Sequence, residues 1–257
     1  MIKKYFLPFI AIMLFASCEK PELDESDSEN NSSLFAELES TYDLNIHYLY
    51  SESFFPDSWL APPINAYGVE IEYSEAERMV KIIDDCLSQY SDIFLSSNLE
   101  DIFLLKRLYF YDMSFGGTSS NTGIYITNDR YSNEFLLARL HSEFSSILYR
   151  NYSSLFPFEE WNRINSSEFE YVGSGVDLLG QDDLYGQTEE LLINGFLVKY
   201  SASSMENDFN MIVDWIFTKP NELHELIQNY DKIREKYNLV IRFYSQINSG
   251  VDFTSVG

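Results

Sequence analysis

Residues 141–148 read His-Ser-Glu-Phe-Ser-Ser-Ile-Leu, which almost reproduces a helical zinc motif. In that motif two imidazoles stand four residues apart on one face of a helix, and a glutamate beside the first acts as general base. Here Glu143 occupies the glutamate position, but the two ligand positions carry the hydroxyls of Ser142 and Ser146. Zinc prefers imidazole, thiolate or carboxylate ligands. The stretch therefore has the spacing of a metal-binding helix without the ligands that zinc needs.

Moving the motif by one residue does not supply the missing ligands. His141 would then need an imidazole at position 145, which is Ser145. The other two histidines, His47 and His224, are far away in the sequence, and their spacing does not indicate a site. Without a metal, Glu143 has no bound water of lowered pKa to deprotonate, so we interpret it as a vestigial general base. An active metallohydrolase that uses ligands outside this motif is the alternative.

The near-motif lies in the middle of a predicted helix over residues 133–152. Apolar residues at positions 136, 140, 144, 147 and 148 repeat with the 3.6-residue period of a helix, and Ser142 and Ser146 lie one turn apart on another face. Strands come first and helices later, so the predicted fold class is α+β. The predicted strands cover residues 42–50, 103–111 and 123–127, the other helices cover 74–95, 189–203, 207–218 and 221–247, and loops cover 116–121 and 173–186.

Four further segments surround the near-motif. They are Tyr-Asp-Leu-Asn-Ile-His-Tyr-Leu-Tyr at 42–50, Leu-Ala-Pro-Pro at 60–63, Asn-Gly-Phe-Leu-Val-Lys-Tyr-Ser-Ala at 194–202 and Asn-Asp-Phe-Asn-Met-Ile at 207–212. In this order and spacing the chain resembles the zinc-binding metallopeptidase lipoproteins of Bacteroidetes-type bacteria. Those proteins accompany SusD-like and TonB-dependent nutrient-uptake systems. The resemblance covers roughly residues 40–250.

The resemblance implies a zincin-like metallopeptidase fold, with a small mixed sheet followed by a mainly helical C-terminal part. It places the two zinc histidines of the family at Ser142 and Ser146, its catalytic glutamate at Glu143 and its third ligand at Asn207. Since all three ligand positions depart from the pattern, we expect no bound metal here, although zinc is expected in the family. The resemblance also implies that residues 124–127 border the cleft, and we place three further residues there: His141, Asp208 and Tyr200. The chain is therefore interpreted as a pseudoenzyme.

The N-terminal residues predict export and a lipid anchor. A basic start precedes an apolar run from Tyr5 to Ala16, which ends just before Cys18. Crossing a bilayer takes about twenty apolar residues, so residues 1–17 are predicted to be a lipoprotein signal peptide with lipidation at Cys18. An ordinary signal peptide with a coincidental cysteine is the alternative. Residues 18–33 are acidic and polar, and they predict a flexible tether before a single domain over residues 34–257.

The expected location and partners follow from the same resemblance. In Bacteroidetes lipoproteins, acidic residues soon after the lipidated cysteine resemble the signal for export to the outer face of the outer membrane. We therefore expect a surface-exposed outer-membrane lipoprotein, with SusD-like or TonB-dependent transporter components as candidate partners. The chain has 17 basic and 41 acidic residues, and this excess of negative charge argues against nucleic-acid binding.

Cys86 and the aromatic residues are assigned to the core. Cys86 lies in an apolar run, and we predict that it is a small buried residue. The 19 Tyr, 20 Phe and 3 Trp could form a glycan platform or fill a large core, and the spacing of Phe144 and Phe209 favours the core. The leading function is non-catalytic binding or scaffolding beside an uptake complex. A glycan- or peptide-binding accessory protein is the further alternative.

Overall fold

The strand β3 (Asp101–Phe110) organises a six-stranded mixed sheet in the computed structural model, which describes residues 35–173 and 183–253. Two strands, β1 (Asn45–His47) and β6 (Gly123–Thr127), pair with β3 in parallel. Two others, β2 (Tyr67–Glu70) and β4 (Met113–Phe115), pair with it antiparallel. The first half of β3 is a run of buried apolar residues, as expected for a strand that is covered on both faces.

The short strand β5 (Gly117–Ser119) forms one end of the sheet. It pairs antiparallel with β6, all of whose residues are buried. The prediction that residues 124–127 border the cleft is therefore wrong, because these residues lie inside the sheet. The segment 116–121 was predicted to be a loop, but part of it folds back on β6 and takes the edge position. Its two adjacent glycines are typical of a turn, so the sequence did not indicate a strand in this segment.

The helix α5 (Asn133–Asn151) matches its prediction closely. Its first turn is capped by Ser132, whose hydroxyl accepts a hydrogen bond from the Phe135 backbone N–H at 3.2 Å. Glu134 near the start and Arg150 near the end suit the helix dipole. The five apolar positions of the predicted stripe are all buried. These features place one face of α5 against the core and leave its polar face for the site.

Two predicted long helices are each broken. Residues 74–95 form α3 (Tyr73–Leu87) and α4 (Asp92–Ser96), because the backbone N–H of Ser91 bonds the carbonyl of Ser249 and leaves the helical path. Residues 221–247 form α9 (Pro220–Asn229) and α10 (Asp231–Gln246), separated by the extended residue Tyr230. Hydrophobic periodicity continues through both breaks, so it could not reveal them.

Two further segments differ from prediction. The helix predicted over 189–203 is α7 (Glu189–Ile193) followed by the short 3-10 helix η4 (Lys199–Ala202), and Gly195 between them has a positive φ of 86°. In the strand predicted over 42–50, only β1 is a strand, and residues 35–42 are helical. The remaining elements are η1 (Glu52–Phe54), α2 (Asp57–Leu60), η2 (Ser153–Leu155), α6 (Phe158–Ile164) and α8 (Met205–Thr218).

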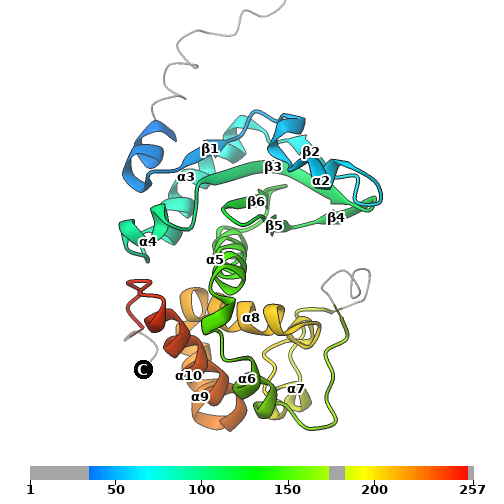
Figure 1. Ribbon diagram of the computed structural model, residues 1–257, viewed down its shortest axis with the longest axis vertical. Helices are drawn as coiled ribbons and strands as arrows, with labels where there is room; N and C mark the ends of the chain where they lie inside the picture. The colour runs from blue at the N-terminus through cyan, green and yellow to red at the C-terminus, as the bar shows by residue number, and fades with distance from the viewer. Residues whose placement is uncertain (1–34, 174–182, 254–257) are drawn as a thin grey trace, which may run out of the picture.

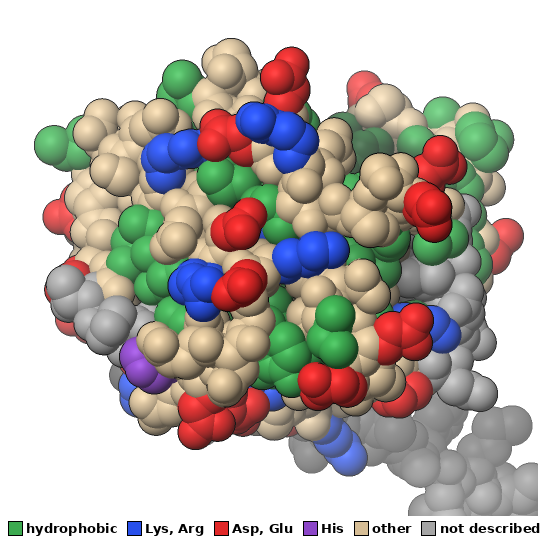
Figure 2. Space-filling model, turned by 90° about the horizontal axis from the view of Figure 1, so that it is seen from below, with side chains coloured by type: hydrophobic (Ala, Val, Ile, Leu, Met, Phe, Trp, Pro, Cys, Tyr) green, Lys and Arg blue, Asp and Glu red, His purple; other side chains and the backbone are tan. Residues whose placement is uncertain are grey.

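The helix α5 lies between the sheet and the C-terminal helices. Figure 1 shows the sheet above α5, with α8 directly below it and α6, α7, α9 and α10 beyond. Cys86 is buried in the core, as predicted. On the face seen in Figure 2, acidic, basic and apolar side chains are interspersed. Within the described residues, no helix combines the length and apolar character needed to cross a membrane.

Candidate functional site

A cavity of about 630 Å³ lies between α5, the β4–β5 strands and the start of α8. It brings together residues that are more than fifty positions apart in the sequence. Four residues that the resemblance marks, and the predicted cleft residue Tyr200, line this cavity: Ser142, Glu143, Ser146, Asn207 and Tyr200. The segment 114–119 closes the opposite side. The predicted geometry of a cleft along the polar face of α5 is therefore present.

Glu143 is held against the edge strand. Its Oε2 accepts a hydrogen bond from the Ser119 hydroxyl at 3.2 Å, and only 9% of the residue is exposed. Burial raises the pKa of Glu143 to about 7, although Arg139 and the hydrogen bond from Ser119 oppose that rise. A carboxyl with this pKa is partly protonated at neutral pH, so it can both donate and accept hydrogen bonds in the cavity.

Two of the three positions that the resemblance assigns to zinc ligands, here called the former ligand positions, are hydrogen-bonded to neighbouring side chains. The Asn210 amide donates to the Ser146 hydroxyl at 2.7 Å, and the Ser145 hydroxyl donates to Asn210 Oδ1 at 2.5 Å. The Asn207 amide donates to the Ser203 hydroxyl at 2.8 Å. This network links α5 to α8 through neutral polar groups.

His141 points away from the cavity, contrary to its predicted place in the cleft. Its ring stacks on Phe217 with a centroid distance of 3.9 Å, and its Nδ1 lies 3.0 Å from the Tyr90 hydroxyl. Burial lowers the pKa of His141 to about 3, so the imidazole is neutral. This residue is part of the core between α3, α5 and α8.

Asp208 also lies outside the cavity, so its predicted place in the cleft is wrong as well. The Lys236 ammonium donates to its Oδ2 at 2.7 Å, and Tyr171 and Trp161 donate to the same oxygen. Lys236 has no exposed surface and Asp208 only 1%. This buried ion pair joins α8 to α10, and neither of its residues lines the cavity.

Two residues that flank the predicted positions, Arg139 and Asp214, were not predicted from the sequence. Arg139 lines the cavity together with Ser142 and Glu143, and it precedes them by three and four residues on the same helix. Asp214 lies beside Ser142, on α8. Burial raises the pKa of Asp214 well above its usual range, while Arg139 and a hydrogen bond with Ser142 oppose the rise. The i, i+3 and i, i+4 spacing on α5 is the signal that could have identified Arg139.

The donor set of this cavity does not suit zinc. The three former ligand positions offer two hydroxyls and one amide, which are poor ligands beside imidazole, thiolate or carboxylate. Across residues 35–173 and 183–253, no three His, Cys, Asp or Glu side chains come together in a way that could hold a metal ion. The residues present therefore do not fit the zinc ion that the resemblance implies.

Comparison with known proteins supports the fold. No protein-family model and no curated protein matches this sequence. Among solved structures, the chain is similar to a protein of Bacteroides caccae ATCC 43185 described as "a putative zinc-binding metallo-peptidase". The two chains are 13% identical, the TM-score is 0.60, and the match covers 91% of each. The predicted α+β class, with a mixed sheet followed by a helical C-terminal part, is confirmed, and the chain has a metallopeptidase-like fold.

Proposed function

We propose that this protein is a non-catalytic, ligand-binding lipoprotein of the outer membrane that has kept the cleft of a metallopeptidase-like fold. The observation that carries the proposal is the chemistry of the three former ligand positions. Ser142, Ser146 and Asn207 all line the cavity, and none of them offers a ligand that zinc prefers. A binding role needs only the cavity and its polar groups, both of which are present.

The location belongs to the same proposal. It is supported by the apolar run before Cys18 and by the acidic segment after it. These residues lie outside the described part of the chain. The SusD-like or TonB-dependent uptake components proposed as partners rest on the resemblance, and the surface exposure rests on the acidic residues at 19–29.

Metal analysis tests the absence of catalysis. We expect protein purified in metal-buffered solution to contain far less than one zinc per chain and to leave protein substrates intact. The physical reason is that hydroxyl and amide groups cannot displace the water held by the ion. A content near one zinc per chain that is lost in Glu143→Gln, together with cleavage of casein, would contradict the proposal. Glu77→Gln, an exposed change on α3, is the matched control.

Restoring the ligands tests the geometry of the same site. The triple change Ser142→His, Ser146→His and Asn207→Glu supplies three zinc ligands around one cavity and leaves a fourth position for water. We expect zinc binding and a metal-dependent rise in Tm, because an ion bound only by the folded state adds stability. If the triple variant folds but binds zinc no better than the wild type, the assignment of these three positions is incorrect.

A further inference from the structure

A second cavity of about 400 Å³ adjoins the first. The two share five lining residues: Arg139, Ser142, Tyr185, Tyr200 and Asn207. Serine, asparagine and glycine supply nearly half of the residues that line the first cavity, whereas apolar side chains from α5 and α8 line much of the second: Phe135, Ala138, Met211 and Trp215. Arg139 therefore stands where the more polar cavity meets the more apolar one.

Within the described residues, the guanidinium of Arg139 makes one hydrogen bond. It donates to the Tyr185 hydroxyl at 2.9 Å, and its carbon lies 5.4 Å from the centroid of the Phe135 ring. Among the described residues, no carboxylate lies within 4.0 Å of it. A guanidinium carries five N–H donors in a planar fork, so one hydrogen bond to a phenol leaves most of them for a ligand.

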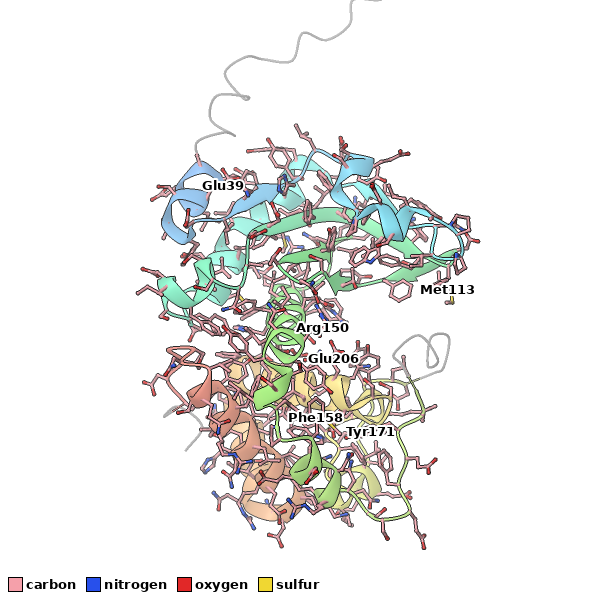
Figure 3. All side chains as sticks on the ribbon, viewed as in Figure 1. Glu39, Met113, Arg150, Phe158, Tyr171 and Glu206 are labelled. Atoms are coloured by element: carbon pink, nitrogen blue, oxygen red, sulfur yellow. The ribbon has the colours of Figure 1, made fainter. Side chains whose placement is uncertain are left out.

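Arg150, the other arginine of the first cavity, is already paired. It lies 3.1 Å from Glu206 and also donates to the carbonyls of Ser119 and Ser120. Figure 3 shows Arg150 and Glu206 close together between α5 and α8. The positive charge of Arg150 is therefore neutralised within the protein. Lys219 lines only the second cavity, where its Nζ lies 5.0 Å from the centroid of the Trp215 ring. Among the described residues, Arg139 is the cation that both cavities share.

The carboxyl groups nearest to Arg139 neutralise its positive charge only in part. Burial raises the pKa of Glu143 to about 7, and it raises the pKa of Asp214 well above its usual range. Asp214 lines the second cavity, is 6% exposed, and its Oδ1 has no hydrogen-bond partner among the described residues. The pKa of Arg139 stays raised although burial alone would lower it, because Tyr185 and Glu143 favour the charged form. The junction thus combines a charged guanidinium with a buried carboxyl oxygen that lacks a partner.

We propose that the joined cavities bind a peptide carboxylate, with Arg139 as its anchor. The inference rests on the proposed binding function and names its ligand class. A carboxylate matches the guanidinium fork in a bidentate geometry. The serine and asparagine side chains of the first cavity can bond peptide amides, while an apolar side chain of the same peptide enters the second cavity beside Trp215. Either the C-terminal carboxylate or an acidic side chain can supply the charge.

Fluorescence anisotropy with three labelled peptides tests the proposal on the full chain. The probes carry an uncharged BODIPY label without a carboxylate, and they are BODIPY-Ala-Ala-Ala-Phe with a free C-terminus, the same peptide as its C-terminal amide, and BODIPY-Ala-Glu-Ala-Phe amide. We expect at least one carboxylate peptide to bind roughly 10-fold or more tightly than the neutral amide. The first probe reports a terminal carboxylate and the third reports an acidic side chain, and a preference for either supports the proposal.

Variants assign the preference to one residue. Arg139→Gln should remove it, and Arg139→Lys should keep part of it, because lysine retains the charge but lacks the fork. Arg163→Gln is the matched control, since Arg163 lies on α6 and lines neither cavity. Circular dichroism checks folding, and if Arg139→Gln does not fold, the comparison of Arg139→Lys with the wild type decides.

Three outcomes would contradict the proposal that Arg139 anchors a peptide carboxylate. These are no binding of any probe at millimolar protein, equal binding of all three probes, and a carboxylate preference that Arg139→Gln or, where that variant does not fold, Arg139→Lys leaves unchanged. Mass spectrometry of the same samples, with zinc added, separates this failure from that of the proposed function. Cleaved peptide would contradict the non-catalytic role, whereas intact peptide without a carboxylate preference would contradict the ligand class alone.

Discussion

Glu143 is a buried carboxyl, and its neighbours offset only part of the free-energy cost of burying its negative charge. It has one hydrogen bond from Ser119, and its neighbour Arg139 does not reach ion-pair distance within the described residues. Its pKa of about 7 in the folded protein compares with a reference value of 4.5 for an unperturbed glutamate. Between pH 4.5 and 7, the Glu143 carboxyl therefore holds a proton in the folded state that it has largely released in the unfolded state. Keeping such a residue has a cost in stability that grows as the pH rises.

Glu143→Gln should remove this pH dependence. Between pH 4.5 and 7 the unfolded chain binds fewer protons than the folded chain at this position, so rising pH favours unfolding of the wild type. From pH 4.5 to 8 the free energy of unfolding should fall by about 2–3 kcal/mol more in the wild type than in the variant. Urea unfolding at several pH values measures the difference. Parallel pH curves for the two proteins would show that Glu143 has an ordinary pKa, and Glu77→Gln should follow the wild type.

Residues adjacent in a helix can have unrelated surroundings, which explains two wrong site predictions. Successive helical residues are about 100° apart around the axis. Ser142 and Asn207 face the cavity, whereas their direct neighbours His141 and Asp208 face the core. The spacing of the near-motif therefore predicted which positions share a face. A residue that follows or precedes a cavity-lining residue in the sequence does not for that reason line the cavity itself.

At the scale of elements, the site depends on how closely β5 approaches α5. Gly117 provides that approach, because a Cβ there would lie 3.0 Å from Glu143 Oε1, 3.1 Å from the Tyr125 carbonyl oxygen and 3.2 Å from Arg139 Cδ. The neighbouring Gly116 has more room, since its nearest neighbour would be 3.6 Å away. A Cβ atom therefore fits at Gly116, whereas at Gly117 the neighbouring atoms would have to move. The sequence does not show this difference, because both glycines are typical of a turn.

Gly117→Ala should separate β5 from α5 and destabilise the protein. Part of the conflict is with the backbone of β6, which cannot turn aside as a side chain can. We expect a loss of about 1–3 kcal/mol in the free energy of unfolding. Gly116→Ala, the matched control, should change it by less than about 0.5 kcal/mol. Equal effects of the two substitutions in urea unfolding would mean that the close approach at Gly117 does not stabilise the site.

Whether a segment forms a helix or a strand was easier to predict than the point at which a helix breaks. The helix α5 and the strands β3 and β6 were found within two residues, because each has a strong apolar pattern. The breaks at Ser91 and Tyr230 were missed, since each depends on a backbone conformation that the apolar pattern does not encode. The edge strand β5 was missed because its pairing with β6 is a tertiary contact of a glycine-containing segment.

At the scale of the whole molecule, the aromatic residues are used mainly for packing. Trp161 is fully buried, Trp215 is 8% exposed, and Trp59 packs against a smaller cluster on the sheet. This distribution agrees with the predicted core role and does not favour a glycan platform built on tryptophan. Charge acts at the same scale, because a net charge of −24 favours a well-solvated protein surface. A net charge of this sign gives no electrostatic attraction to anionic lipid, so the proposed membrane location would depend on the proposed lipid at Cys18.

The two cysteines of the chain allow a direct test of the proposed anchor. Lipidation requires a cysteine just after the apolar run, which is the position of Cys18, whereas Cys86 is 1% exposed in the core. We expect metabolic labelling with a fatty-acid analogue to mark the wild type and Cys86→Ala, and not Cys18→Ala. Cys18→Ala should also leave the outer-membrane fraction, since no polybasic segment substitutes for the lipid. Equal labelling of Cys18→Ala and the wild type would end the lipoprotein proposal without affecting the argument for the cleft.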